Sequence, residues 1–198
     1  MITGFILAGG ASSRMGSDKA LLALNGRSFI ERLAARLGRH VSSLIVIGHL
    51  AHHKALRALP VDAVITDLQT GLGPLMGIYT GLMYTQTPLN LFVSCDMPRL
   101  DDRTIERLVN AWSDAWEIVA HQSPDGRIQP LPLLCHQRAC RTAGRLLDQK
   151  MPSLQNWIGR SASRLCPIEN DFTPDAFTNV NTPEDYERLC GDARGLYP

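Results

Sequence analysis

The sequence predicts an α/β fold, a doubly wound and mostly parallel sheet flanked by helices, and three observations carry this prediction. Short runs rich in Val, Ile and Leu recur along the chain, with the length and composition of buried parallel strands. Segments with helical hydrophobic spacing alternate with these runs. Glycines, carboxylates or amides follow several of the runs directly, at the positions where such sheets bind ligands.

Length and composition set the outer limits of this prediction. The chain has 198 residues, which fits one domain spanning 1–198. An apolar fraction of 44% and a charged fraction of 20% are those of an ordinary globular fold and exclude intrinsic disorder. The formal net charge is +1 and no basic run stands out, so we expect no nucleic-acid partner.

The same sequence predicts a cytoplasmic protein that does not enter membranes. Its apolar stretches are far shorter than the roughly 20 residues that a membrane span needs. Met1–Gly10 is apolar but has no basic start, so it is predicted to contain a first strand and not a signal peptide. The five cysteines include no Cys-x-x-Cys pair, which favours free thiols in a reducing compartment.

Seven apolar runs are predicted strands, the last of them the weakest. The segment Gln122–Gln129 is polar and rich in turn residues, and it is expected to form a loop or hairpin beside the main sheet. The predicted strands are Gly4–Ala8, Leu44–Gly48, Ala63–Thr66, Leu91–Ser94, Glu117–His121, Leu131–Leu134 and Ala162–Pro167.

Helices are predicted between and after these strands. Ser28 and Glu31 form a capping box ahead of a helix with one apolar face. Asp101–Ala115 has apolar residues at helical spacing, and Thr182–Asp185 opens a last helix with a cap, a proline and acidic residues. In Gly73–Tyr84 a glycine recurs every four residues, which favours close packing of that helix on the sheet.

A glycine-rich string follows the first predicted strand. Gly9 and Gly10 would let the backbone approach a ligand and direct amide groups at phosphate oxygens. Arg14 and Lys19 place two cations where a triphosphate would need them. The spacing matches neither a Walker A loop nor Gly-x-Gly-x-x-Gly. The string predicts a phosphate-binding loop; the alternative is a structural turn with surface charges.

Two aspartates also follow predicted strands. Asp96 comes directly after the buried run Leu91–Ser94, and a lone carboxylate there suits Mg²⁺, which takes its other ligands from water and phosphate. The alternative for Asp96 is a helix cap or an ion-pair partner. Asp67 follows the third predicted strand, where an aspartate is more often a turn or cap residue.

Two amides flank an apolar residue near the end of the chain. In Asn179-Val180-Asn181 the valine would point inward while both amides face one side, where they could bind phosphate or a metal-bound water. The alternative is a turn before the last helix. Cys95 has no evident partner base, so it is expected to be a small buried side chain and not a nucleophile. The six histidines form no zinc-binding pattern.

Taken together, these strings resemble one enzyme family. The order is Leu-Ala-Gly-Gly-x-Ser-x-Arg-Met-Gly-x-Asp-Lys from Leu7, then Gly73-Pro74-Leu75-x-Gly77-Ile78, Cys95-Asp96-x-Pro98 and Asn179-Val180-Asn181-Thr182-Pro183. The sequence is similar to the molybdenum cofactor guanylyltransferases, nucleotidyltransferases with a Rossmann-like fold, over nearly the whole chain.

The resemblance implies a reaction and its substrates. The family transfers GMP from GTP to molybdenum-loaded molybdopterin and releases pyrophosphate, with Mg²⁺ as cofactor. Other cofactor-biosynthesis proteins and chaperones specific for molybdoenzymes are the implied protein partners. By position, Arg14, Lys19 and Asp96 are the implied catalytic residues, and Asp96 the metal ligand. The implied nucleotide-binding residues are Leu7, Ala8, Gly9, Gly10, Lys19, Asp67 and Asp96, and the implied acceptor-binding residues are Asn179 and Asn181.

One position departs from the family pattern. Some guanylyltransferases have an asparagine that contacts the nucleotide where this chain has Gly48. The Ala8-Gly9-Gly10 string nevertheless favours guanine, because relatives that use CTP have Ala-Ala-Gly there. Two other functions remain open: a nucleotidyltransferase with another base or acceptor, such as CTP or a sugar phosphate, and a non-catalytic nucleotide-binding accessory protein.

Overall fold

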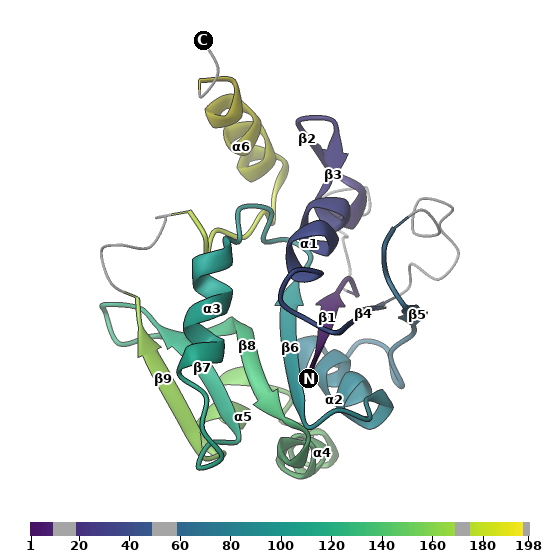
Figure 1. Ribbon diagram of the computed structural model, residues 1–198, viewed down its shortest axis with the longest axis vertical. Helices are drawn as coiled ribbons and strands as arrows, with labels where there is room; N and C mark the ends of the chain where they lie inside the picture. The colour runs from purple at the N-terminus through teal and green to yellow at the C-terminus, as the bar shows by residue number, and fades with distance from the viewer. Residues whose placement is uncertain (10–18, 49–58, 169–174, 196–198) are drawn as a thin grey trace.

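A mixed sheet forms the centre of the protein, as the computed structural model in Figure 1 shows for the described residues, 1–9, 19–48, 59–168 and 175–195. Within these residues the sheet has seven strands in the order β5-β4-β1-β6-β8-β7-β9, and β2 pairs with β3 separately. The strands are β1 (Ile2–Leu7), β2 (Ala23–Leu24), β3 (Arg27–Ser28), β4 (Ser43–Ile47), β5 (Ala63–Ile65), β6 (Leu89–Ser94), β7 (Ile118–Gln122), β8 (Ile128–His136) and β9 (Ser163–Pro167).

Helices cover both faces of this sheet. The described helices are α1 (Phe29–Leu37), α2 (Pro74–Tyr84), α3 (Asp102–Asn110), α4 (Cys140–Asp148), α5 (Leu154–Gly159) and α6 (Pro183–Gly195), with short 3₁₀ turns at η1 (Lys19–Leu21) and η4 (Gln137–Ala139). None of the described helices combines the length and the apolar character that crossing a membrane would require. The predicted doubly wound, mostly parallel fold is confirmed.

Strand direction separates the sheet into two parts. β1 pairs in parallel with β4 and β6, and β5 continues that parallel arrangement beside β4. β8 runs antiparallel to both of its neighbours, β6 and β7. The expectation that Gln122–Gln129 lies beside the main sheet is therefore wrong, because this segment turns between two strands of the sheet itself. Five residues between β7 and β8 are too few for a crossover, so the strands must be antiparallel.

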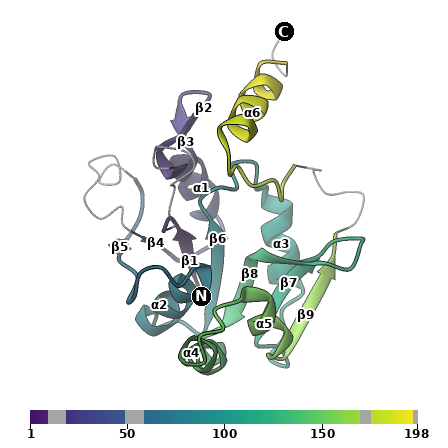
Figure 2. The same cartoon turned by 180° about the vertical axis from the view of Figure 1, so that it is seen from behind.

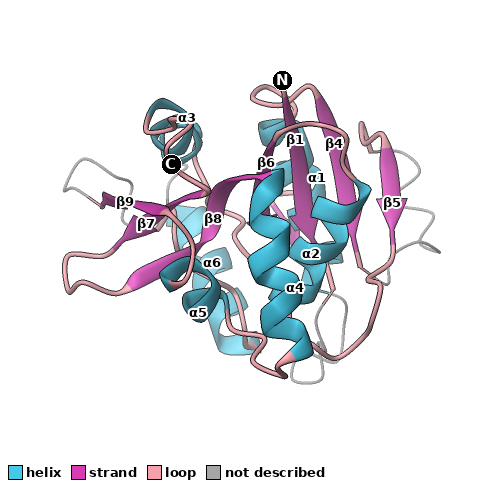
Figure 3. Ribbon diagram, turned by 90° about the horizontal axis from the view of Figure 1, so that it is seen from below, coloured by secondary structure: helices cyan, strands magenta, loops and turns pink. Residues whose placement is uncertain are grey.

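Two hydrophobic clusters pack on opposite faces of the sheet, as the alternation of side chains along each strand requires. Ile6 of β1 lies in the cluster beneath α1 and α3, whereas Phe5 and Leu7 lie in the cluster beneath α2, α4 and α5. Figure 3 shows α2 and α4 neighbouring each other on the second face, and Figure 2 shows α5 near them. Phe5 stacks on Phe92 of β6, with ring centroids 4.7 Å apart.

The glycines of α2 bring its backbone onto the strands. A Cβ at Gly81 would lie 2.8 Å from the Phe92 ring and 3.0 Å from Ile47, and one at Gly77 would lie 2.9 Å from Leu7. No larger residue fits without displacing these core side chains. The close packing predicted from the four-residue glycine spacing is confirmed.

The other predicted helices form with local corrections. The capping box of Ser28 and Glu31 is present at the start of α1. α3 is capped by Asp101 but ends at Asn110, five residues before the predicted Ala115, because the chain turns at Trp112 and Trp116. The sequence reasoning missed α4 and α5, which are short and bury few residues, as well as the hairpin of β2 and β3.

Candidate active site

The strands end together where the winding of the sheet reverses. From β1 the chain proceeds outward to β4 and β5, and then returns to place β6 on the other side of β1. Hydrogen bonds continue one residue past the strands: the amide of Ala8 donates to the Ile47 carbonyl at 2.7 Å, and that of Cys95 to the Leu7 carbonyl at 3.0 Å. The residues after β1 and β6 therefore share one edge at the switch point, where such folds bind ligands.

Asp67 lies against the loop that follows β1. A Cβ at Gly9 would be 2.9 Å from Oδ2 of Asp67, and a Cβ at Gly77 in α2 would be 3.4 Å from its Oδ1. The segment that carries Asp67 is tied to α2 by a hydrogen bond from the Leu68 amide to the Thr80 hydroxyl, 3.1 Å long. The structure thus brings Gly9 and Asp67, two of the predicted nucleotide-binding residues, into direct proximity.

Gly48 has a backbone conformation and a location that exclude a side chain. Its φ is +148°, and a Cβ there would lie 2.6 Å from the Gly9 nitrogen and 2.7 Å from the Ala8 carbonyl carbon. The Gly48 amide donates to the Ile65 carbonyl at 3.0 Å, which holds the turn in place. With this backbone, position 48 has no room for the asparagine of some relatives.

Asp96 is placed at the same edge by the buried strand β6. Its carboxylate atom Oδ1 is buried and accepts no hydrogen bond within the described part of the chain. A buried carboxylate oxygen without a donor suits a hard divalent cation. The described residues contain no group of three or more His, Cys, Asp or Glu that could hold a metal by themselves. The described residues alone therefore do not complete the coordination of a metal at Asp96.

The segment with the two asparagines crosses the loop after β6. The Val180 amide donates to the main-chain carbonyl of Asp96 at 2.9 Å. Val180 is 1% exposed and packs in a small apolar cluster with Phe29, whereas Asn179 and Asn181 on either side of it are exposed. The predicted inward valine is confirmed, and its hydrogen bond places the segment of the two predicted acceptor residues next to the main chain of Asp96.

Further contacts hold this segment at both of its ends. Arg99, in the loop after β6, forms an ion pair with Asp175. At the other end, one carboxylate oxygen of Asp185 accepts from the amides of Asn181 and Thr182 at 2.9 and 3.0 Å. The hydrogen bonds from these two backbone amides hold the pKa of Asp185 below its usual value. The predicted start of the last helix is confirmed, while Arg99 and Asp175 were not singled out by sequence reasoning.

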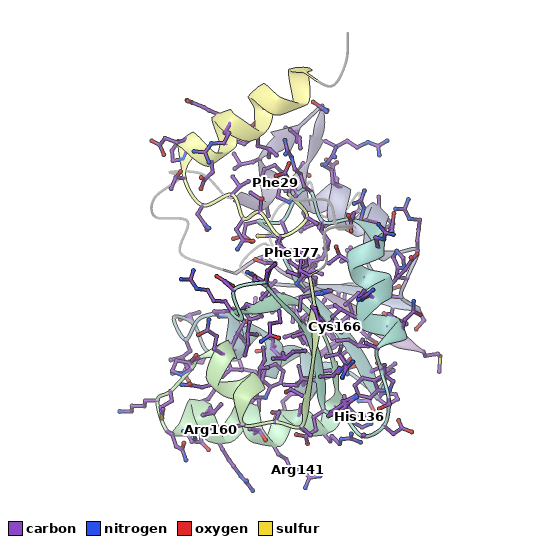
Figure 4. All side chains as sticks on the ribbon, turned by 90° about the vertical axis from the view of Figure 1, so that its left-hand side faces the viewer. Phe29, His136, Arg141, Arg160, Cys166 and Phe177 are labelled. Atoms are coloured by element: carbon purple, nitrogen blue, oxygen red, sulfur yellow. The ribbon has the colours of Figure 1, made fainter. Side chains whose placement is uncertain are left out.

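His121 lies in the core below this segment. Its Nε2 is 3.1 Å from the Thr104 carbonyl and donates to it, and the edge of its ring meets Phe177 with centroids 5.0 Å apart. In β7, His121 pairs with Cys166 of β9, and Figure 4 shows Phe177 above Cys166 and Phe29 higher still, towards α6. Burial lowers the pKa of His121 to about 4, so the ring is neutral at physiological pH.

Some of the predicted site residues are outside the described residues or are described only in their main chain. Gly10 and Arg14 are outside the described residues. Lys19 is the first residue of η1, and its side chain is not described. The main chain of η1 leads to Ala20, which is buried in the cluster beneath α1.

The fold and this edge together define a class of protein. A doubly wound sheet has a glycine turn and a carboxylate on one side of the switch point, and a second carboxylate beside two amides on the other. These are the features of a nucleotidyltransferase, which must hold a nucleoside triphosphate and an acceptor next to each other.

Comparison with known proteins identifies the family. Residues 4–164 match the MobA-like NTP transferase domain. The molybdenum cofactor guanylyltransferase of Yersinia pestis (strain Pestoides F) is 34% identical over 199 residues, covering 98% of this chain and 97% of that protein. This chain belongs to the MobA-like NTP transferase family, and it is a nucleotidyltransferase. The resemblance inferred from the sequence motifs is confirmed.

Solved structures support the same fold. The molybdopterin-guanine dinucleotide biosynthesis protein A of Archaeoglobus fulgidus matches with a TM-score of 0.82 at 20% identity, over 98% of this chain and 99% of that one. A protein of Mycobacterium tuberculosis H37Rv, crystallised in complex with manganese, matches with a TM-score of 0.68 at 22% identity, over 96% and 97%.

Proposed function

We propose that the chain, acting as a single nucleotidyltransferase domain, transfers GMP from GTP to the terminal phosphate of molybdenum-loaded molybdopterin. The products are the molybdopterin guanine dinucleotide and pyrophosphate. The observation that carries the proposal is the hydrogen bond between Val180 and Asp96, which joins the two motifs of a family whose members include molybdenum cofactor guanylyltransferases. The five cysteines include no Cys-x-x-Cys pair, and this supports a cytoplasmic location.

The nucleotide is assigned to the edge formed by β1, β4 and β5. Leu7, Ala8, Gly9 and Gly10 would face it with backbone, and Gly9, which has no side chain, would let a ligand approach beside Asp67. Because Gly48 can carry no side chain, Asp67 is our candidate for reading the base. A carboxylate can accept from both the N1–H and the exocyclic amine of guanine, a donor pair that adenine and cytosine do not present together.

Asp96 is assigned to a divalent cation, which we propose to be Mg²⁺. Its buried Oδ1 fits this role, and a structurally similar protein was crystallised with manganese. The chemistry that such an ion supplies when bound is neutralisation of the negative charge on the α-phosphate. Asp67 lies at the other side of the edge, and its proposed contact is with the nucleotide. Its effect on the transfer step would therefore be indirect.

The transfer step needs little acid–base chemistry from the protein. An oxygen of the acceptor phosphate attacks the α-phosphorus, the bond from that phosphorus to the bridging oxygen breaks, and pyrophosphate leaves with the electron pair. The attacking phosphate is already anionic near neutral pH, so no strong general base is required. Arg14 and Lys19 would stabilise the charge that builds on the leaving pyrophosphate, and Asn179 and Asn181 would position the acceptor.

The decisive experiment measures turnover with defined substrates. Release of pyrophosphate is followed with GTP, CTP or ATP in the presence of Mg²⁺, without an acceptor, with molybdopterin, or with a sugar phosphate. We expect turnover with GTP and molybdopterin only. Asp96→Asn should reduce this turnover by about 10²–10³, the usual loss for one electrostatic contact to a transition state. Asp148→Asn, an exposed change on α4, is the matched control and should leave turnover unchanged.

Each other outcome identifies a different function. Turnover with CTP would retain the reaction class and reject guanine, and turnover with a sugar phosphate would reject the acceptor. Binding of GTP without any turnover would indicate a nucleotide-binding accessory protein. Full activity of folded Asp96→Asn would reject Asp96 as the metal ligand.

A further inference from the structure

A strongly basic pocket lies on the outer side of α1, apart from the residues assigned to the reaction. It has a volume of about 230 Å³ and lies between α1 and the loop that follows β6. Four arginines line it, and the remaining lining residues are apolar. They are Arg27, Arg32, Arg36 and Arg39, with Leu33, Ala35, Pro98 and Leu100. Figure 1 shows α1 beside the loop from β6 to α3 that supplies Pro98 and Leu100.

The arginines are aligned by the helix. Arg32, Arg36 and Arg39 are spaced four and three residues apart, so they share one face of α1 and of the turn that follows it. Like charges at these spacings destabilise a helix. The whole chain carries a formal net charge of only +1, so this concentration of positive charge is local.

The wall of the pocket is held in place by contacts from its own arginines. Arg36 donates to the main-chain carbonyl of Leu100, a bond to a neutral acceptor that fixes the guanidinium. Arg39 donates to both carboxylate oxygens of Asp102 at 2.9 and 2.8 Å, and His40 contacts the same carboxylate. Asp102 is therefore already shared, and none of the described residues that line the pocket is acidic.

The positive charge of the pocket affects Asp102, the acid that Arg39 contacts. Burial raises the pKa of the Asp102 carboxyl, but the hydrogen bonds from His40 and Arg39 and the charge of Arg36 outweigh it, so that pKa lies below its usual value. Arg32 and Arg36 are half-buried, whereas Arg27 and Arg39 are more exposed. Guanidinium groups remain charged when buried, so the four arginines together give the pocket a positive potential that attracts anions.

We propose that this pocket binds a phosphate group. A planar guanidinium donates two parallel hydrogen bonds that match the oxygens of a phosphate, and several such groups around one cavity suit a dianion. The volume has room for more than one phosphate group, so the ligand is inorganic phosphate, pyrophosphate or the phosphate end of a small metabolite. Bound phosphate would link α1 to the loop that carries Asp96.

This site is independent of the proposed reaction. It uses none of the residues assigned to the nucleotide, metal or acceptor, and it would remain if the substrates proposed above were wrong. Pro98 places it only two residues along the chain from Asp96. Occupancy could therefore affect turnover, but binding itself can be measured without any substrate.

The test is calorimetric titration with inorganic phosphate and, separately, with pyrophosphate, at low ionic strength and without divalent metal. Arg36→Lys retains the positive charge and removes the planar donor pair, and Arg32→Gln removes a charge. Arg141→Gln with Arg160→Gln is the matched control, because both side chains are exposed and point away from the protein at its far end (Figure 4). A parallel titration with a polyglutamate peptide tests whether the pocket prefers carboxylates.

We expect each pocket variant to weaken phosphate binding by about tenfold or more, the cost of one lost charged hydrogen bond, while the control retains wild-type affinity. Tighter binding of pyrophosphate than of phosphate, lost in the same variants, would identify the larger anion as the ligand. Because Arg32→Gln could disturb folding, thermal unfolding without phosphate is measured on each variant, and phosphate at one fixed concentration should raise the Tm of the pocket variants less than that of wild type and control.

Several results would overturn the proposal. Equal phosphate affinity in wild type and both pocket variants would place any binding elsewhere. Binding of polyglutamate but of neither phosphate nor pyrophosphate would assign the pocket to an acidic protein partner. If phosphate bound only at concentrations far above those in a cell, phosphate would not be the physiological ligand of this pocket.

Discussion

The two sides of the switch point are built in different ways. On the side that we propose to bind the nucleotide, the nucleotide side, β1, β4 and β5 are parallel, and their ends meet through the backbone of Gly9 and Gly48. On the acceptor side, the reversed strand β8 interrupts the parallel order, and a distant chain segment is held by Val180 and by the ion pair of Arg99 with Asp175. The structure of the nucleotide side depends on two positions that carry no side chain. The structure of the acceptor side depends on contacts that side chains make.

This difference has a functional meaning. Backbone that fits closely against backbone leaves a rigid wall, which suits a nucleotide that every catalytic cycle must hold in the same way. A segment held by a few separate contacts can be adjusted by single substitutions without disturbing the sheet. We therefore expect variants on the nucleotide side to lose stability and nucleotide affinity together, and variants on the acceptor side to lose acceptor affinity alone.

The largest effect is expected for Gly48→Ala. The new methyl group would lie 2.6 Å from the Gly9 nitrogen, at a φ that side chains rarely adopt. Backbone strain and overpacking together should cost about 3 kcal/mol or more of unfolding free energy, and should weaken GTP binding. Urea unfolding and calorimetry with GTP measure both quantities.

Gly71→Ala is the matched control for this change. Gly71 also has a positive φ, +82°, but a Cβ there meets nothing within 4 Å. It should cost only about 1 kcal/mol, the strain of the backbone conformation alone. If both variants lost the same stability, the close approach of Gly48 to Gly9 would not be what holds the nucleotide side together.

A pH-dependent effect of similar size is expected in the core of the protein, at His121, which lies below the acceptor segment. Burial lowers the pKa of this ring to about 4 from 6.5, with Arg107 also lowering it while the Thr104 carbonyl and Asp101 oppose the shift. The unfolded chain therefore takes up a proton below pH 6.5 that the folded protein does not accept until about pH 4. The stability due to neutral His121 is complete above pH 6.5 and is lost as the pH falls through this window, about 3 kcal/mol in total.

His121→Gln isolates this contribution, because glutamine can still donate to the Thr104 carbonyl but does not titrate. Between pH 6.5 and 4 its unfolding free energy should fall by about 3 kcal/mol less than that of the wild type. His136→Gln, at the half-buried end of β8, is the control and should change the slope much less. Parallel curves for His121→Gln and wild type would show that His121 is not the titrating group.

Sequence reasoning succeeded where the signal is local. The apolar runs of the strands, the capping box of Ser28 and the glycine spacing of α2 each follow from a few adjacent residues. The loop after β1, Asp96 and Asn179–Asn181 were found because each adjoins a strand end or a helix start. The direction of β8 could also have been inferred, since five residues cannot form a crossover.

What the sequence could not show depends on contacts between distant residues. Arg99 and Asp175 are 76 positions apart, and neither differs in type from other surface charges of the chain. The resemblance implied that Asp67 binds the nucleotide, but its position between Gly9 and Gly77 is shown only by the structure. The spacing of Arg32, Arg36 and Arg39 is visible in the sequence, but only the loop of Pro98 and Leu100 turns that helix face into a pocket.

The smallest expected effect, and the sharpest test of the difference between the two sides, concerns the ion pair of Arg99 and Asp175. Its side chains are 21% and 48% exposed, so screening by water limits it to about 1 kcal/mol. Arg99→Gln and Asp175→Asn should each raise the KM for molybdopterin about fivefold, with the double variant no worse than either single one, because the three share one lost interaction. The Kd for GTP should stay at its wild-type value. The ion pair of Arg127 with Asp125, at the turn between β7 and β8, provides control variants of the same chemistry away from the site. Equal losses for GTP and molybdopterin, or losses that add in the double variant, would mean that the acceptor segment is not positioned separately from the nucleotide wall.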